Sequence, residues 1–148
     1  MGWTFFPPLR TCSVTAGTWA IAATPVPRPV DSQDLTQCCP FVDRDRWMAV
    51  VSGPTSCVNL DWFLRALRPE LALEEANAVA EAFDPGAPVP LYLPYLYRDL
   101  AKPGLSGAFL GLAPEHTWRD LLRAVYEGVA FAHRLQLDRL ARAGLDRE

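Results

Sequence analysis

The chain has 148 residues, half of them hydrophobic and 21% charged, and its formal net charge is -3. This balance is typical of a globular domain, and the lack of a basic surplus argues against nucleic-acid binding. No apolar run approaches the roughly 18 residues needed to cross a bilayer, and residues 1–9 lack the charged start and long apolar core of a signal peptide. We therefore expect a soluble, cytoplasmic protein with no membrane or nucleic-acid partner.

Residues 11–24 are rich in small and β-prone side chains around Ala16-Gly17-Thr18. We expect two short strands joined by a tight turn, because glycine adopts the positive φ that such turns require. Three prolines follow within five residues, and they predict an exposed loop over residues 25–37.

A short apolar run at 47–51 is followed by Ser-Gly-Pro at 52–54, which predicts a buried strand and its end. Thr55 or Ser56 is expected to cap the next helix, because a side-chain oxygen there can accept a hydrogen bond from a free N–H group of the first turn. Leucine and phenylalanine side chains recur at helical spacing over residues 60–67, and a proline after them ends the helix.

The middle of the chain alternates a weak helix with loops. Residues 73–83 predict a second helix, whose two early glutamates suit the positive N-terminal end of a helix. Residues 84–90 hold three prolines and one glycine and therefore predict a loop. Residues 91–97 are aromatic-rich but interrupted by Pro94, which is typical of an edge strand or an extended loop. The glycine-rich residues 104–111 follow.

The longest predicted element is a helix over residues 117–143. Thr117 is a suitable cap, and Asp120, three residues later, can complete a shortened capping box. Gly144 is the expected stop, because helices commonly end at a glycine. One apolar stripe runs along this helix, made by Trp118, Leu121, Leu122, Val125, Gly128, Val129, Ala132 and Leu135.

Side chains that could carry catalysis or bind a metal are scattered. The four cysteines form no CxxC pair, so they are interpreted as reduced thiols and not as metal ligands. Neither His116 nor His133 has a neighbour of the nucleophile–base type, and His133 is interpreted as a surface or packing residue. No pair of aspartates stands out.

Two loops could meet phosphate oxygens through free N–H groups: the turn at Gly17 and the strand-to-helix loop at 52–56. Taken alone, the first is better explained as an ordinary hairpin turn and the second as a loop with a helix cap, and no GK[ST] motif follows the second loop. The residues by themselves predict an α/β domain of unknown activity.

Residues 107–127 read GAFLGLAPEHTWRDLLRAVYE. This stretch resembles the C-terminal signature of the FGGY carbohydrate kinases, which spaces small, hydrophobic, glycine, polar, aliphatic and acidic positions in a fixed order. The matching residues are Gly107, Phe109, Gly111, Leu112, Asp120, Leu121, Ala124, Val125, Tyr126 and Glu127.

Other segments resemble the same family. Pro94-Tyr95-Leu96 is similar to its PYL motif, and residues 123–131 are similar to its "RAxxEGxAF" helix. The turn at 16–19 resembles the family's "GT" turn, which approaches the ATP phosphates, and residues 52–62 resemble the loop that lines the nucleotide. The resemblance covers roughly residues 12–144.

The resemblance implies a fold. The family has two ribonuclease-H-like, actin-like domains around a cleft, with sugar bound mainly by the first and ATP by the second. We therefore expect an incomplete α/β domain of this type, a partial C-terminal kinase domain at 11–148 after an unmatched segment at 1–10. Strands near 11–24, 47–52 and 107–112 are expected to form a mixed sheet with packed helices.

ATP and Mg²⁺ are the cofactors that the resemblance implies, and it places four residues beside the nucleotide: Gly17, Thr18, Cys57 and Asn59. The family usually has a glycine near the position of Cys57, where a side chain would narrow the approach of a nucleotide. No metal ligand and no catalytic residue is assigned, because the family's catalytic aspartate precedes the "GT" turn and no aspartate occurs here before Asp31.

The activity implied is transfer of the γ-phosphate of ATP to a hydroxyl group of a sugar, a pentulose or a related polyol. The chain is expected to be one part of such a kinase and to be inactive alone. Two alternatives stand beside this: a noncatalytic remnant that binds a protein partner, and a weak nucleotide-binding module. The implied partners are ATP, a sugar, and either a complementary kinase half or a second copy of the chain.

Overall fold

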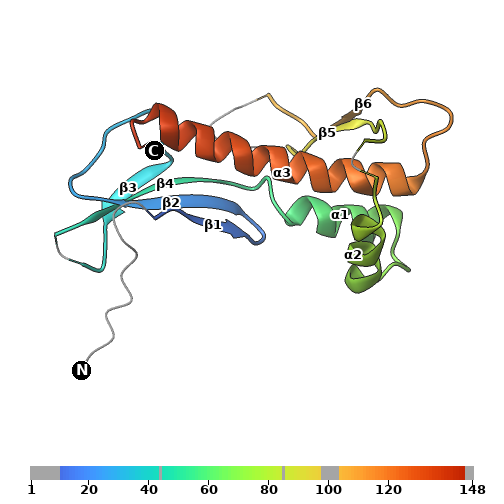
Figure 1. The fold of residues 1–148 in the computed structure, drawn as a ribbon, viewed down its shortest axis with the longest axis horizontal. Helices are drawn as coiled ribbons and strands as arrows, with labels where there is room; N and C mark the ends of the chain where they lie inside the picture. Colours follow the sequence, from blue (N-terminus) through green and yellow to red (C-terminus); the bar gives the residue numbers. More distant parts are fainter. Residues whose placement is uncertain (1–10, 44, 85, 98–103, 146–148) are drawn as a thin grey trace.

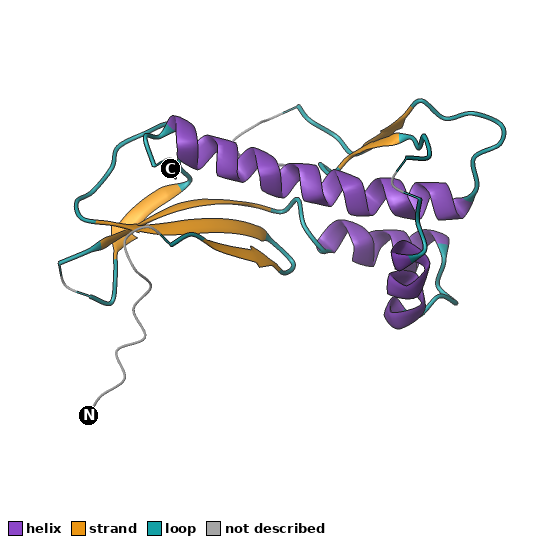
Figure 2. Ribbon diagram, in the orientation of Figure 1, coloured by secondary structure: helices purple, strands orange, loops and turns teal. Residues whose placement is uncertain are grey.

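The structure, a computed structural model, describes residues 11–43, 45–84, 86–97 and 104–145. A four-stranded sheet lies at one end, two short helices and a two-stranded sheet lie at the other, and one long helix runs along both ends (Figures 1 and 2). Within these ranges no helix is long and apolar enough to cross a membrane. The elements are β1 (Ser13–Ala16), β2 (Ala20–Val26), β3 (Gln37–Pro40), β4 (Trp47–Gly53), α1 (Val58–Leu67), α2 (Leu73–Glu81), β5 (Leu91–Leu93), β6 (Ala108–Leu110) and α3 (Trp118–Arg142).

The main sheet has the strand order β1-β2-β4-β3. The predicted hairpin is confirmed, since β1 pairs with β2 from Ser13↔Ala23 to Ala16↔Ala20, and the predicted buried strand is β4. The sequence predicts a mixed sheet, whereas every pairing between described strands is antiparallel. The connection between β1 and β2 has only three residues, and a parallel pair would need a crossover of about a dozen.

The predicted loop over residues 25–37 is wrong at both ends. Strand β2 continues through Pro25 to Val26, and Gln37 begins β3. Pro25 is tolerated because β1 pairs only as far as Ala23, so β2 has a single partner strand at the proline. Strand β3 has the sequence Gln-Cys-Cys-Pro, which lacks the alternation of apolar and polar residues that indicates a strand.

Helix α1 begins later than predicted, and the predicted caps are wrong. Its N-cap is Cys57, which makes no side-chain cap, so neither Thr55 nor Ser56 has that role. Ser56 is fully buried, and its hydroxyl lies beside His133 instead. The hydroxyl is therefore committed to the interior and cannot satisfy the N–H groups of the first turn. Helix α2 confirms the second predicted helix.

The glycine-rich segment is separate from the main sheet. Strand β6 pairs antiparallel with β5, from Leu91↔Leu110 to Leu93↔Ala108, so the prediction that residues 107–112 join the same sheet as the hairpin is wrong. Pairing with β5 closes only one short loop, which costs little entropy compared with pairing far along the chain. Helix α3 contacts β5 as well as β2 and β4, and it thereby connects the two sheets.

Helix α3 confirms the longest predicted element to within one residue at each end. Thr117 caps it, its N–H group donates to Asp120 (2.7 Å) to complete the capping box, and Gly144 follows at a φ of 75°. Half of the predicted apolar stripe is buried, at Leu122, Val125, Gly128 and Ala132, and the other half is partly buried. Two polar side chains, Arg123 and Gln136, are buried along the same helix, which the sequence does not predict.

Gly128 lets α3 approach β5 closely, and its replacement by alanine is expected to destabilise the protein. A Cβ atom at this position would lie 2.6 Å from the backbone oxygen of Tyr92, which cannot move without shifting the strand. We expect Gly128→Ala to lower the free energy of unfolding by about 1–3 kcal/mol, although alanine is the better helix former. Urea unfolding followed by circular dichroism measures this.

Gly17→Ala is the matched control, because its Cβ would meet its nearest atoms only at 3.9 Å and 4.0 Å. We expect it to change the free energy of unfolding by no more than about 0.5 kcal/mol. Equal effects of the two variants would contradict the close approach at Gly128.

Candidate functional site

The β1–β2 turn and the start of α1 form one surface. The N–H group of Cys57 donates to the carbonyl oxygen of Gly17 (3.0 Å), and its thiol donates to that of Ala16 (3.3 Å). The N–H group of Gly17 donates a hydrogen bond to the backbone oxygen of Trp19 (3.3 Å), which closes the turn. The predicted turn conformation is wrong, because Gly17 does not have a positive φ. Two segments about forty residues apart are thus joined where the resemblance expects phosphate.

This surface offers hydrogen-bond donors to an anion. Thr18 is exposed in the turn. The first turn of α1 has no side-chain cap, although the N–H groups of Cys57 and Asn59 donate to backbone oxygens of Gly17 and Ser56. The positive end of the helix dipole can still attract negatively charged oxygens. Asp61 in the same turn is acidic and weakens this attraction. Backbone groups and one hydroxyl, rather than basic side chains, would therefore bind the anion.

Asn59 lies behind this surface and not on it. It is fully buried, and its amide nitrogen donates to the oxygen of Ser56 (3.1 Å) and, more weakly, of Pro54 (3.5 Å). Its amide oxygen accepts a hydrogen bond from the hydroxyl of Tyr92 (2.9 Å), and burial raises the pKa of that hydroxyl. Asn59 thus fixes the loop that precedes α1 and ties it to β5.

His133 has a partner that the sequence does not reveal. Its Nε2 atom lies 3.1 Å from the Oγ atom of Ser56, 77 residues earlier in the chain. Desolvation by burial lowers the pKa of His133 and favours the neutral ring. A serine next to a histidine can be a nucleophile–base pair, but Ser56 is fully buried and no substrate can reach its hydroxyl. The pair is structural and supports the loop from behind.

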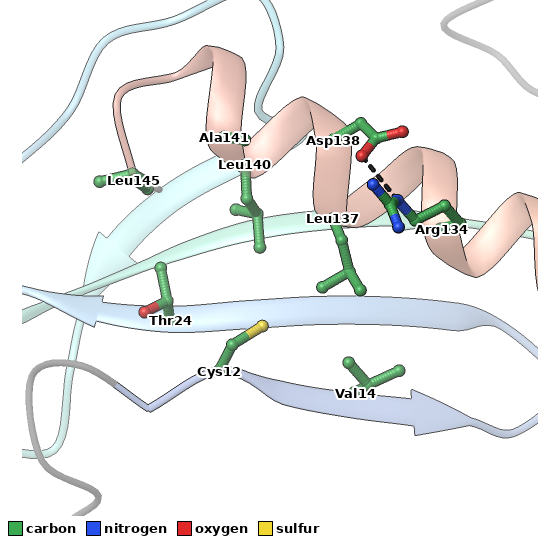
Figure 3. A pocket seen from close by; sticks show the side chains of 9 residues that line it. All are labelled: Cys12, Val14, Thr24, Arg134, Leu137, Asp138, Leu140, Ala141 and Leu145. Atoms are coloured by element: carbon green, nitrogen blue, oxygen red, sulfur yellow. Dashed lines mark hydrogen bonds and ion pairs between the residues drawn. The ribbon is translucent and has the colours of Figure 1, made fainter. Parts of the chain in front are cut away.

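A groove of about 420 Å³ opens between the hairpin and the last turns of α3 (Figure 3). Leu137 of α3 faces Val14 of β1 across it, and Leu140 points toward Cys12. Arg134 and Asp138 form an ion pair (2.9 Å) on the helix beside the groove. None of the four residues expected to bind the nucleotide lines this groove, which is completed by Cys12, Thr24, Ala141 and Leu145.

The described residues provide no metal site of their own. Among them, no three histidine, cysteine, aspartate or glutamate side chains come together in a way that could hold a metal ion. Mg²⁺ prefers several oxygen ligands, commonly one or two carboxylates together with phosphate oxygens. The described part of the chain therefore does not fit a Mg²⁺ ion held by protein side chains alone.

The arrangement of helices and sheets is that of part of an actin-like ATPase domain. The xylulose kinase from Rhodospirillum rubrum superposes with a TM-score of 0.85 at 22% identity, covering 96% of this chain and 29% of that one. A xylulose kinase from Brucella ovis gives a TM-score of 0.78, also at 22% identity, and the superposition covers 90% of this chain and 28% of that one. At these identities the similarity shows the fold alone.

The family follows from the sequence comparisons. The model of the C-terminal domain of the FGGY family of carbohydrate kinases matches residues 12–147, and the chain belongs to this family. A probable L-xylulose kinase of Pasteurella multocida is 31% identical over 129 residues, which are 84% of this chain and 26% of the relative. The L-xylulose/3-keto-L-gulonate kinase of Escherichia coli is 32% identical over 100 residues, covering 68% and 20%. The chain spans about a quarter of the length of the curated relatives it matches.

Removing the hydroxyl group of Tyr92 tests the role of Asn59. In Tyr92→Phe the buried amide oxygen of Asn59 loses its donor, and an unsatisfied buried polar group costs about 1–3 kcal/mol. We expect a decrease of that size in the free energy of unfolding, measured by urea denaturation.

Tyr126→Phe is the matched control, because its hydroxyl donates to Asn77 (2.7 Å) at an exposed position where water can replace it. We expect a cost below about 0.5 kcal/mol. A loss in Tyr92→Phe no larger than in this control would show that Asn59 is not held by the tyrosine.

Proposed function

We propose that this chain is the nucleotide-facing part of an ATP-dependent carbohydrate kinase that acts on a pentulose. The observation that carries the proposal is the junction of Gly17 and Cys57, which places an exposed hairpin turn beside a helix start that has no side-chain cap. The names of the relatives, L-xylulose kinase and xylulose kinase, support a pentulose as the sugar. The sugar itself would be bound mainly by the other domain of a complete kinase.

The four proposed nucleotide residues have different roles. Gly17 and Thr18 would face the phosphate oxygens. Thr18 would contact them through its hydroxyl, whereas the N–H group of Gly17 already donates to Trp19 and keeps the turn in shape. Cys57 would hold the turn against α1 while its side chain limits how closely the nucleotide approaches. Asn59, which is fully buried, would act by fixing the loop and not by touching ATP. Mg²⁺ would enter with the phosphates.

We expect the chain by itself to bind ATP weakly and not to phosphorylate sugars. No residue matches the family's catalytic aspartate, and a general base is typically worth about 10² to 10⁴ in rate. In an NMR titration, ATP should shift the amide signals of Gly17, Thr18 and Cys57, and Thr18→Glu should weaken binding by about tenfold, or 1.4 kcal/mol, through charge repulsion.

Val42→Glu is the control for this titration, because it adds the same charge at an exposed site beyond the opposite end of β4. It should leave the affinity for ATP within about twofold, or 0.4 kcal/mol. A coupled kinase assay with several pentuloses completes the test. Turnover of a sugar that depends on a residue of this chain would overturn the proposal. NMR shifts on addition of ATP that are confined to other parts of the chain would also overturn it.

An interaction module is the second candidate, and the β1 edge of the main sheet, which pairs with no further described strand, favours it. All four residues of β1 are exposed, and beside them Val14 and Leu137 remain 49% and 38% exposed at the groove. Open strand edges next to apolar surface favour association. The partner would be a complementary kinase half or a second copy of the chain.

We expect the purified chain to self-associate unless a complementary half covers this edge. Val14→Lys should reduce association, because a charge on an edge strand opposes further pairing, whereas Val42→Lys on the β3–β4 loop should not. Sedimentation velocity measures both. A monomeric wild-type chain that binds no hydrophobic dye, or equal effects of the two lysines, would contradict the role of the β1 edge.

A further inference from the structure

Two buried polar atoms of α3 have no hydrogen-bond partner among the described residues: Nδ1 of His133 and Oε1 of Gln136. The other polar atom of each side chain is engaged. Nε2 of His133 lies 3.1 Å from the hydroxyl oxygen of Ser56, and Nε2 of Gln136 donates to the carbonyl oxygen of Ala20 (2.9 Å). A buried polar atom without a partner is destabilising, so both atoms need an explanation.

The two atoms are chemically complementary. Desolvation lowers the pKa of His133 and favours the neutral ring, which carries one proton. If the hydroxyl of Ser56 donates to Nε2, that proton is on Nδ1, which is then a donor without an acceptor. The amide oxygen of Gln136 is an acceptor without a donor. Residues three apart on a helix are neighbours on its surface, so the two side chains lie side by side on α3.

Because no direct hydrogen bond joins the two side chains, we propose that one water molecule bridges His133 Nδ1–H and Gln136 Oε1. The relay then runs from the hydroxyl of Ser56 through His133 and Gln136 to the carbonyl oxygen of Ala20. Gln136 also lines a cavity of about 20 Å³ together with Ser52, Thr55 and Arg139. A cavity of this size has room for a single water molecule.

The ends of the relay give it a role. Ser56 directly precedes Cys57, and Ala20 is the first residue after the turn that contains Gly17 and Thr18. The relay therefore supports both parts of the proposed phosphate surface, the β1–β2 turn and the start of α1, from the interior of the protein. His133 and Gln136 are thus positioning residues. Only this role depends on the proposed function; the water bridge between the two side chains does not.

The tautomer of His133 tests the relay in the full chain. The protein has only two histidines, so ¹⁵N-detected NMR can assign both rings. We expect the proton of His133 on Nδ1, with exchange at least about tenfold faster in Gln136→Leu than in the wild type, because the acceptor is lost. Arg134→Ala on the exposed side of α3 is the control and should leave the exchange unchanged. A proton on Nε2, or equal exchange in both variants, would overturn the proposal.

Gln136→Glu provides a second test, with a readout that would not change if Gln136 only filled space in the core. A carboxylate beside the ring should raise the pKa of His133 by about one or more, because an opposite charge favours the protonated form. An unchanged pKa would overturn the link even if Gln136→Leu fails to fold.

The positioning role has its own readout. Exchange of the Cys57 amide, which bonds to Gly17, should be faster in Gln136→Leu and unchanged in Arg134→Ala. Unchanged exchange at Cys57 would remove the positioning role. ATP titrations of the same samples separate the outcomes, because loss of ATP binding with the relay intact would count against the proposed function alone.

Discussion

Helix α3 buries one face against both sheets and both shorter helices, and the rest of the structure depends on that burial. One core cluster gathers Tyr92, Phe63 and Leu122 at the N-terminal half of the helix, and a second gathers Ala22, Val51 and Leu140 at its C-terminal half. Neither sheet could bury its apolar face without this helix. The close approach at Gly128 fixes how deeply the helix sits, because any side chain there would meet the backbone of Tyr92.

Polar contacts within this packing specify one arrangement. Arg123 is buried on α3, its guanidinium donates to the carboxylate of Glu127 (2.7 Å) and to the backbone oxygen of Asp84, and it lies over the ring of Phe83. Buried polar groups are costly unless they are satisfied. An alternative packing of α3 would have to break such contacts, so they make the fold specific as much as they make it stable.

The proposed phosphate surface follows from the same layout. It consists of a turn and a helix start that are held together by backbone hydrogen bonds and supported from behind by buried side chains. Donors of this kind suit phosphate oxygens, because backbone N–H groups at a helix start carry partial positive charge without a basic side chain. The surface is therefore determined more by how the backbone is placed than by the chemistry of its side chains.

The sequence by itself determined the local elements and the family. The capping box at Thr117, the stop at Gly144 and the hairpin around Gly17 depend on residues close in the chain, and each is confirmed as an element. Strand β3 and the separate pairing of β5 with β6 were not predicted, because a strand gains its hydrogen bonds from a partner that the local pattern does not identify.

Only the tertiary structure decided what the polar side chains do. Asn59 was expected at the nucleotide but is buried against Tyr92, and His133 was interpreted as a surface or packing residue but meets Ser56 across 77 positions. The reason is physical. A helix cap depends on residues within one turn of the helix, whereas a buried polar group bonds to any group that the packing brings within about 3 Å. Such contacts leave no periodicity or spacing in the sequence.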